Sequence, residues 1–288
     1  MLCGGERFVR LFSQVPPPQG DVVAPPSYRI THSQRVLVGA ILRCTDCGLA
    51  MMPPPARTQD SYEEAADPHY IEQAEQRVAN SHALLAMVPP GGRLLDVGCA
   101  CGFLLVAGRE RGFEVEGVEL SRWASEYGRN QLGLDIRRGE LCELRLPAER
   151  YDVVTMVDVI EHLIDPRAVV AEVRRLLRPG GRVVLLTPDL GSLVARLTGP
   201  RWYGLLDDHY FYFSRDTLRR FLESEGFEVE RFEAFGRRFP LDHWSYKLSQ
   251  YSPLLSRGLG RLFKVLRIDK LQVSVNLGDQ MACVARKI

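Results

Sequence analysis

The sequence has no long apolar run and no marked excess of charge of either sign. None of its apolar stretches approaches the ~18 residues that span a bilayer, so no transmembrane helix is expected. The first residues lack a basic segment followed by an apolar core, and no secretory signal peptide is expected. The formal net charge is only +1 at pH 7, whereas domains that bind nucleic acid are usually strongly basic. We therefore expect neither a membrane-spanning protein nor a nucleic-acid partner.

A regular disulfide framework is also missing. The seven cysteines lie at positions 3, 44, 47, 99, 101, 142 and 283, an odd set of which several fall in predicted core elements. This distribution favours reduced thiols and a cytoplasmic location. The hydrophobic content of 45% and the charged content of 25% are ordinary for a globular chain. A length of 288 residues suits one α/β domain with appendages, or one domain and a smaller one.

Two regions of different character follow each other along the chain. Residues 1–56 contain three cysteines and two clusters of three prolines, which predicts a small, loop-rich lobe. Residues 57–288 form the main domain, which begins with a helical segment up to about residue 90. Segment 236–278 is predicted to be a helical insertion in this domain.

Strand and helix patterns alternate from Arg93 onward. Strands are expected over residues 93–99, 114–120, 134–138, 151–157, 182–187, 227–232 and 281–286, and helices over residues 103–112, 122–132, 166–177 and 215–225. Alternation with helices, and a strand at 151–157 that is apolar on both faces, are typical of a parallel sheet covered on both sides. The pattern predicts a doubly wound, Rossmann-like, mostly parallel α/β sheet of seven strands.

Segment 94–102 combines a buried strand, a glycine-containing turn and the start of an apolar helix. This layout brings backbone N–H groups close to a ligand at a helix N-terminus, where the helix dipole adds partial positive charge. The next strand ends in Glu119, about 20 residues past the turn, where a carboxylate can accept hydrogen bonds from ribose hydroxyls. Together the two features predict a cofactor that contains a nucleoside.

Five motifs over about residues 60–235 resemble, in order and spacing, the class I S-adenosylmethionine-dependent methyltransferases. They are LDVGCACG at 95–102, GVE at 117–119, YDVV at 151–154, DVIEHL at 158–163 and LRPGG at 177–181. One departure is Ala100, where the turn of this family usually carries a glycine. Alanine should be tolerated there if its φ angle is negative.

The resemblance implies S-adenosylmethionine as the cofactor. Asp96 would orient the turn and the ammonium group of the cofactor, and Glu119 would accept both ribose hydroxyls. Gly98 and Gly102 would let the backbone approach the cofactor. The rest of the implied cofactor site comprises Ala100, Leu120, Asp158 and Glu140, the last of which lies where the family contacts adenine. The alternative is that the acids are merely solvated residues at strand ends.

Asp158, Glu161 and His162 follow the fourth predicted strand, at the sheet edge where open α/β folds bind ligands. In the family this loop faces the sulfonium and the acceptor, which makes Asp158 and His162 candidate catalytic residues. The trio is also similar to that of quinone-biosynthesis O-methyltransferases, where it can hold a divalent cation. Such a cation would activate a phenol or hydroxyl by lowering its pKa. The alternative is that Glu161 and His162 only begin the following helix.

A second polar cluster, residues 202–214, follows the fifth predicted strand. His209 is a candidate general base because the unperturbed pKa of histidine lies near the working pH. Four aromatic side chains could form a wall for a ring-shaped acceptor or for the sulfonium charge, namely Trp202, Tyr203, Tyr210 and Tyr212. The alternative is a histidine that hydrogen-bonds a loop, among aromatic residues that only pack.

Cys44 and Cys47 have the spacing of one half of a zinc site, and Cys3 resembles the end of the other half. The missing fourth cysteine would fall one position before Met1. Either the start of the chain is truncated or the site has lost a ligand, for which His32 is a conceivable substitute. The lobe is similar to zinc-ribbon-like lobes of some sugar and secondary-metabolite methyltransferases. It would be structural or cover the substrate, because a closed four-ligand site does no chemistry.

The insertion at 236–278 carries eight basic side chains against two acids, interleaved with apolar residues. This composition is typical of a basic amphipathic segment, which could rest on an anionic membrane or recognise a phosphorylated or lipid-linked acceptor. The alternative is a solvated helix face opposite a core-facing stripe.

The resulting prediction is O-methylation of a small-molecule hydroxyl on a sugar, a quinone or phenol, or a secondary metabolite. Alternatives are a carbon or nitrogen centre of a sugar or lipid-linked glycan, nucleic acid, and a non-catalytic binding protein. After the fourth strand, a DNA methyltransferase that acts on amino groups would show Asn/Asp-Pro-Pro-Tyr, and one that acts on cytosine C5 would show Pro-Cys. Residues 157–160 read Val-Asp-Val-Ile, which disfavours both. The acceptor and the oligomeric state stay open.

Overall fold

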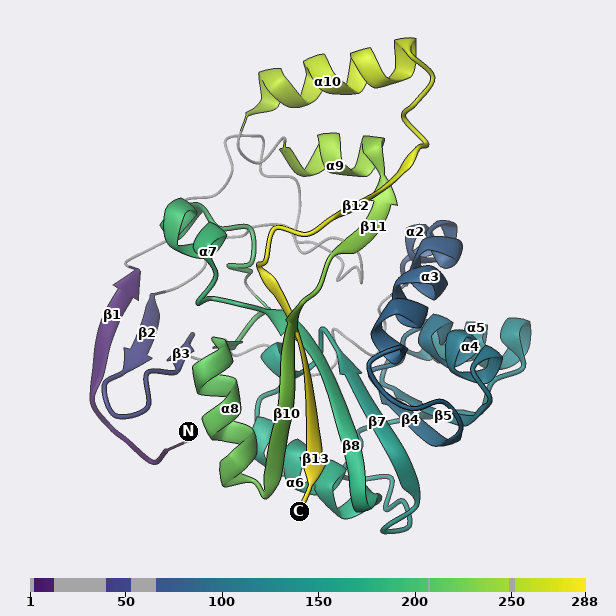
Figure 1. Ribbon diagram of the computed structural model, residues 1–288, viewed down its shortest axis with the longest axis vertical. Coiled ribbons are helices and arrows are strands. Elements are labelled where there is room, and N and C mark those ends of the chain that lie inside the picture. The colour runs from purple at the N-terminus through teal and green to yellow at the C-terminus, as the bar shows by residue number, and fades with distance from the viewer. Residues whose placement is uncertain (1–2, 13–39, 53–65, 207, 249–251) are drawn as a thin grey trace.

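The computed structural model describes residues 3–12, 40–52, 66–206, 208–248 and 252–288. His32 and the two clusters of three prolines lie outside the described residues. A central sheet of seven strands with helices on both faces makes up most of the structure, and a smaller sheet and a helical cap are attached to it (Figure 1).

The central sheet has the strand order β10-β13-β8-β7-β4-β5-β6. Its strands are β4 (Gly92–Val97), β5 (Phe113–Glu119), β6 (Ile136–Arg138), β7 (Tyr151–Val157), β8 (Leu177–Pro188), β10 (Phe227–Ala234) and β13 (Gln280–Lys287). All neighbouring pairs from β8 to β6 are parallel, and only β13 runs antiparallel to both of its neighbours. The predicted mostly parallel, seven-stranded sheet is therefore confirmed.

The helices pack on the two faces of this sheet because successive strand residues point to opposite sides. Along β8, Val183 and Leu185 face one core cluster, and the residue after each faces the other. The first cluster lies under α6 (Pro166–Leu176) and α8 (Arg215–Ser224), and the second under α3 (Ala74–Leu85) and α4 (Phe103–Glu110). Two apolar faces on the central strands β7 and β8 explain the apolar patterns that the sequence shows there.

Local signals set the helix boundaries close to the predicted ones. Helix α5 (Arg122–Leu132) begins after Ser121, whose side chain accepts the N–H of Ala124, and ends at Gly133 in the left-handed region. Ser214 begins α8 with a reciprocal capping box to Thr217. The largest boundary difference is in β8, which starts at residue 177 because the chain there already pairs with Tyr151.

The N-terminal lobe shares a sheet with the main domain. Strands β1 (Phe8–Phe12), β2 (Ile41–Cys44) and β3 (Ala50–Met51) continue into β9 (Phe211–Tyr212), which belongs to the polar cluster after β8. Ala50 pairs with Tyr212, and Met51 pairs with Phe211. The lobe is thus joined by hydrogen bonds to a segment beside the candidate site, whereas the boundary at residue 56 stays a prediction.

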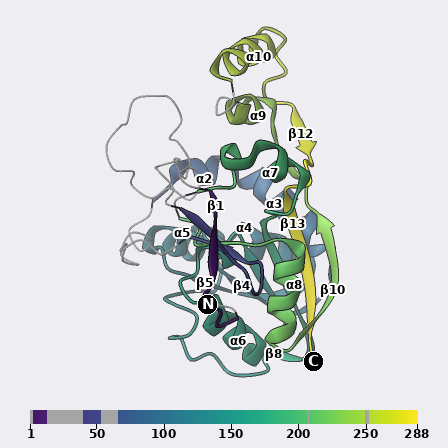
Figure 2. The same ribbon diagram turned by 90° about the vertical axis from the view of Figure 1, so that its left-hand side faces the viewer.

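The insertion forms a cap beyond the end of the central sheet (Figure 2). It contains helices α9 (Leu241–Leu248) and α10 (Pro253–Val265), and also a two-stranded sheet of β11 (Arg237–Pro240) and β12 (Gln272–Val275). The predicted helical pattern is present, and the pairing of β11 with β12 closes the base of the insertion. No helix in the described part of the chain has both the length and the apolar character to span a bilayer.

Candidate active site

Glu119 and Asp96 lie at the carboxyl ends of the neighbouring parallel strands β5 and β4. The two oxygens of Glu119 accept hydrogen bonds from the backbone N–H groups of Ala100 and Ser121, each at 2.7 Å. The carboxylate therefore ties the turn after β4 to the start of α5. Each carboxylate oxygen has a second lone pair for a ligand.

The turn after β4 requires left-handed backbone at three positions. The φ angles are 70° at Gly98, 47° at Ala100 and 87° at Gly102. The expectation of a negative φ at Ala100 is therefore wrong, because alanine there adopts the left-handed conformation that glycine adopts more readily. A Cβ at position 98 would lie 2.6 Å from the side chain of Val159, so the loop after β7 closes directly over the turn.

Asp96 is buried and Glu119 is half-buried at this edge, and burial raises the pKa of both carboxyl groups. The pKa of Asp96 rises to about 7, although the Thr155 hydroxyl donates a 2.7 Å hydrogen bond to it, and the nearby Glu119 charge raises it further. Burial also raises the pKa of Glu119 against its backbone hydrogen bonds. A cationic ligand group next to these acids would stabilise their ionised forms. The pair therefore fits the ammonium and ribose groups of S-adenosylmethionine.

A pair of stacked aromatic rings that the sequence did not assign to the site lies near Asp96 and Glu119. Tyr70, in α2 (Pro68–Glu72), stacks on Phe103 with ring centroids 5.6 Å apart, and the Arg77 guanidinium lies 3.6 Å from the centre of the Tyr70 ring. Burial raises the pKa of Tyr70 to about 12, and the charges of Asp96 and Glu119 contribute. The sequence shows Tyr70 only as one apolar position of a helical pattern.

The two remaining predicted cofactor residues follow neighbouring strands. Leu120 comes directly after β5, and Glu140 comes two residues after β6. The backbone N–H of Gly139 donates to the carbonyl of Glu119 at 3.1 Å, which holds the segment before Glu140 against the end of β5. Both residues lie at the same sheet edge as Glu119, and their contacts with adenine stay a prediction.

A second cluster forms where the loop after β7 meets the segment before β9. Glu161, His162 and His209 each offer a ligand atom within 4.8 Å of the others. Nδ1 of His162 lies 2.9 Å from the carbonyl oxygen of Asp208, and Nδ1 of His209 lies 3.1 Å from that of Gly204. A carbonyl accepts a hydrogen bond only from a protonated nitrogen, so Nε2 of each neutral ring carries a lone pair.

The charges in this second cluster are coupled. Burial raises the pKa of Glu161 to about 7, while its Oε2 accepts a 2.9 Å hydrogen bond from Thr187. Burial opposes a charge on His162, but the negative charges of Asp208 and Glu161 outweigh it and raise its pKa. Burial and the nearby His162 lower the pKa of His209 to about 4. At neutral pH His209 is therefore neutral and able to accept a proton or a metal ion.

Asp158 does not join these ligand atoms. Nη2 of Arg237, from the first strand of the cap, lies 2.5 Å and 2.6 Å from its two carboxylate oxygens. Burial favours the neutral carboxyl, but the Arg237 charge and hydrogen bonds outweigh it and lower the pKa of Asp158. The expected Asp158, Glu161 and His162 metal trio is therefore not the set that the structure brings together, because an arginine already neutralises Asp158.

The aromatic residues of segment 202–214 mainly pack. Trp202, Tyr210 and Tyr212 are buried in the core cluster under α6 and α8, and the Tyr212 hydroxyl donates to the carbonyl of Leu206 at 2.9 Å. Tyr203 is less buried, and burial together with its contact with Asp279 raises its pKa. Of the predicted aromatic wall, only Tyr203 lies among the polar groups around Arg237.

Comparison with known proteins agrees with this geometry. A family model described as a methyltransferase domain matches residues 70–231, which is more than half of the chain. The chain belongs to the class I S-adenosylmethionine-dependent methyltransferases. The matched region contains the predicted cofactor residues together with Glu161, His162 and His209. The N-terminal lobe and the cap lie outside it.

Individual relatives of this methyltransferase match over only part of their length. A Mycolicibacterium smegmatis protein named "Probable S-adenosylmethionine-dependent methyltransferase" is 35% identical over 145 residues, which are 49% of this chain and 53% of that protein. A ubiquinone biosynthesis O-methyltransferase from Alkalilimnicola ehrlichii is 35% identical over 105 residues, 34% of this chain and 42% of that protein. The chain therefore spans about half the length of these relatives.

A solved structure supports the fold of the methyltransferase. The crystal structure of an S-adenosylmethionine-dependent methyltransferase from Thermotoga maritima superposes with a TM-score of 0.52 at 18% identity, covering 76% of this chain and 95% of that one. At this identity the match establishes the architecture, and the substrate has to be argued from the site itself.

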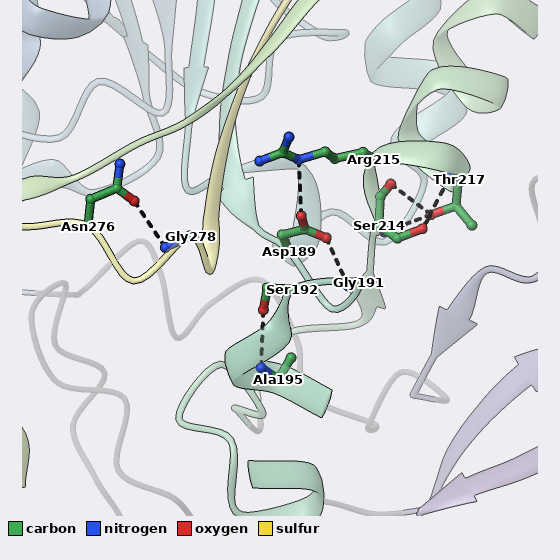
Figure 3. A network of polar contacts seen from close by, with 9 residues as sticks. All are labelled: Asp189, Gly191, Ser192, Ala195, Ser214, Arg215, Thr217, Asn276 and Gly278. Atoms are coloured by element: carbon green, nitrogen blue, oxygen red, sulfur yellow. Dashed lines mark hydrogen bonds and ion pairs between the residues drawn. The ribbon is translucent and has the colours of Figure 1, made fainter. Parts of the chain in front are cut away.

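A network of polar contacts fixes the turn after β8 (Figure 3). Asp189 accepts the Gly191 N–H at 2.8 Å and pairs with Arg215, at the start of α8, at 3.3 Å. Ser192 caps α7 (Leu193–Thr198) by accepting the N–H of Ala195 at 3.1 Å. One buried carboxylate thus fixes the starts of two helices, between which the chain runs past His209.

The three cysteines of the N-terminal lobe also meet. Sγ of Cys3 lies 3.5 Å from Sγ of Cys44, and the ligand sulfurs of Cys3, Cys44 and Cys47 all lie within 4.8 Å of one another. A tetrahedral zinc ion with zinc–sulfur bonds of about 2.3 Å would place its sulfurs about 3.8 Å apart. The cluster therefore has the dimensions of a zinc site, and all three thiols are free.

Proposed function

We propose that the protein transfers a methyl group from S-adenosylmethionine to a hydroxyl oxygen of a small-molecule acceptor. The observation that carries this proposal is the pair of His162 and His209 rings, whose centroids lie 4.6 Å apart beside Glu161. Nε2 of the neutral His209 ring provides a proton acceptor close to the loop that covers the cofactor turn. A hydroxyl that gains a methyl group must lose its proton, and this pair can take it.

The donor half of the site is proposed to bind the cofactor by charge and by backbone approach. Glu119 would accept the ribose hydroxyls, and Asp96 would face the ammonium group. Gly98 and Gly102 have positive φ angles, and a Cβ at either position would collide with the side chain of Val159 or Leu134, so the turn keeps its tight path beside the proposed cofactor site. Leu120 and Glu140 complete the adenine side. When bound, S-adenosylmethionine supplies an electrophilic methyl group that the acceptor oxygen takes as the carbon–sulfur bond breaks.

In the acceptor half, His209 is proposed as the general base. Its Nδ1–H donates to the Gly204 carbonyl, which directs the lone pair of Nε2 toward the cluster. Burial is the main cause of the lowered pKa of His209, and the charge of a protonated His162 lowers that pKa further, an effect that ends when His162 loses its proton. The rate should therefore rise with pH across the raised pKa of His162. Asp158, held by Arg237, acts by positioning the loop.

The nature of the acceptor rests on the relatives. Several matched proteins are named ubiquinone biosynthesis O-methyltransferases, which supports an oxygen centre and a phenolic acceptor. A carbon or nitrogen centre of a sugar or lipid-linked glycan remains the alternative class, with nucleic acid the weakest candidate. We also retain a cytoplasmic location as a proposal, supported by seven free cysteines.

A specific observation also supports a second mechanism, in which a divalent cation binds to Glu161, His162 and His209. Oε1 of Glu161 is buried and has no hydrogen-bond partner among the described residues. Both histidines are oriented by carbonyl oxygens through Nδ1, as metal-binding histidines usually are. The metal set would then be Glu161, His162 and His209. A cation there would lower the pKa of the acceptor hydroxyl instead of leaving the proton to His209.

We further propose that Cys3, Cys44 and Cys47 bind zinc, with one further ligand to complete the tetrahedron. The lobe's position supports a structural role, because its strand β3 pairs directly with β9 beside His209. A stable lobe would hold the segment that carries the proposed base.

The test is a methyl-donor turnover assay with phenols, sugars and lipid-linked sugars, run with the wild-type protein and with His209→Ala. Turnover of one class, lowered about 100-fold or more by His209→Ala, would support the proposal. The matched control is His82→Ala, because His82 on α3 pairs with Glu110 at the end of α4, and both side chains are partly exposed. Full turnover by His209→Ala would remove His209 as the base. Activity lost on chelation and restored by a divalent ion would favour the cation instead.

A further inference from the structure

Helix α10 is the outermost element of the cap. Both views place it beyond α9 and farthest from the central sheet (Figures 1 and 2). One side packs on α9, where a Cβ at Gly260 would lie 3.6 Å from the hydroxyl of the buried Ser245. None of the 13 residues of the helix is buried. A helix that packs along one side only leaves the rest of its surface to another partner or to solvent.

The open surface of α10 is apolar to an unusual degree. Leu254 is 78% exposed and Val265 is 80% exposed, and the other large exposed apolar residues of α10 and the turn after it are Leu255, Leu262 and Leu266. At 3.6 residues per turn, these side chains project from one continuous sector, next to the side that contacts α9. A solvated helix face would carry polar residues here, so the structure argues against the solvated-face alternative.

A basic strip runs along the other border of this apolar sector. Arg257, Arg261 and Lys264 are exposed, and the helix contains no acidic residue. No ion pair to a carboxylate is formed by these three side chains within the described residues. The helix therefore carries a charge of +3 on one strip, whereas the whole chain carries +1.

We propose that α10 docks on the surface of an anionic lipid bilayer. The arrangement of an apolar sector bordered by lysine and arginine is that of helices that lie flat in a membrane interface. The leucines would enter the boundary between headgroups and acyl chains, and the basic strip would contact anionic headgroups. A protein partner with an apolar groove would explain the leucines but not the basic strip beside them. A second copy of this chain would bring two basic strips together, and their like charges would repel.

The cap connects this surface to the candidate active site. Strand β11 begins at Arg237, which holds Asp158 in the loop after β7, and β12 returns directly from the α10 side. Docking through α10 would therefore bring the acceptor side of the site to the membrane. An acceptor that resides in the bilayer could enter the site without crossing water. The docking itself does not depend on the proposed methyl transfer.

The experiment is co-sedimentation of the full chain with vesicles, with no cofactor or acceptor added. We expect binding to vesicles of mixed phosphatidylglycerol and phosphatidylcholine, little binding to phosphatidylcholine alone, and weakening by salt. Arg257→Glu combined with Arg261→Glu should lower the affinity at least about tenfold. Leu262→Glu should lower it as well, because it removes an apolar contact.

The matched control is the double substitution Arg219→Glu with Arg220→Glu, which reverses two charges on α8. Helix α8 lies away from α10 in Figure 1. This variant should bind like the wild type, and unchanged S-adenosylhomocysteine binding will show that each variant is folded. Absence of wild-type binding to anionic vesicles, or equal loss in the α8 control, overturns the proposal. So does a dimer in light scattering that Leu262→Glu converts to monomer. None of these outcomes bears on methyl transfer.

Discussion

Arg237 and Asp158 are 79 residues apart in the sequence, yet Nη2 of Arg237 lies 2.5 Å and 2.6 Å from the two carboxylate oxygens of Asp158. Asp158 has a φ of 53°, in the left-handed region, which non-glycine residues rarely adopt. The ion pair therefore holds an unfavourable backbone conformation in the loop after β7 and attaches that loop to the cap.

Replacing Arg237 should destabilise the protein and disturb this loop. Arg237→Ala leaves a partly exposed carboxylate without its cation, and we expect a loss of about 1–2 kcal/mol in the free energy of unfolding at pH 7. The pKa of Asp158 is lowered in the folded state, so its contribution is present above the ordinary value of 3.8 and is lost as the pH falls further. Urea unfolding at several pH values measures both effects.

The control for this prediction is the next residue. Arg238 uses its backbone N–H and carbonyl to contact Asn80, so Arg238→Ala should leave the stability within about 0.5 kcal/mol of the wild type. An equal loss in the two variants would mean that the Asp158 pair is not the source of the effect.

Ala100→Gly should stabilise the protein. Alanine pays a steric penalty at its φ of 47°, which glycine avoids. We expect a gain of about 0.5–1 kcal/mol in thermal or urea unfolding. As a matched control, Ala107→Gly in the middle of α4 should cost about 1 kcal/mol, because glycine is a poor helix former. Destabilisation by both substitutions would show that the turn does not hold Ala100 in the left-handed region.

Glu119→Ala should weaken the binding of S-adenosylhomocysteine about 100-fold, since it removes a charged acceptor for the ribose and releases the N–H groups of Ala100 and Ser121. Calorimetry measures the affinity. Glu114→Ala, on the same strand but at the surface beside Arg93, should bind normally. Unchanged affinity in Glu119→Ala would refute the ribose assignment.

Cofactor binding should release a proton near neutral pH. The pKa of Asp96 is raised to about 7 in the free protein, and an ammonium group beside it would lower that pKa. The affinity for S-adenosylhomocysteine should therefore fall by up to about tenfold per pH unit below pH 7. Asp96→Asn has no proton to release, so its affinity should be nearly independent of pH over this range. The same slope in both proteins would exclude Asp96 as the group that faces the ammonium.

Zinc in the N-terminal lobe can be tested by elemental analysis. The wild-type protein should contain one equivalent, and Cys44→Ser should contain little, because three sulfurs within 4.8 Å share the ion. The control is Cys142→Ser, since Cys142 is exposed and far in sequence from the cluster. Loss of zinc should also lower the melting temperature, because β3 pairs with β9. A wild-type protein without zinc would contradict the assignment.

Much of the fold follows from the sequence alone. Helix 122–132 and strand 151–157 have the predicted boundaries, because a serine cap, a following glycine and an uninterrupted apolar run act over a few residues. The closeness of Asp96 and Glu119 was also predictable, since the carboxyl ends of parallel strands meet at one edge of the sheet. Local signals and sheet geometry thus determine the cofactor side.

The acceptor side depends on contacts that have no local signal. Asp158 of the predicted metal trio binds Arg237 instead, and His209 lies beside Glu161 and His162. The sequence shows each of these residues but not which atoms meet, because the partners come from segments separated by long stretches of chain. Periodicity predicts which face of an element is buried, whereas the pairing of side chains across the sheet edge is decided only when the loops and the cap pack together.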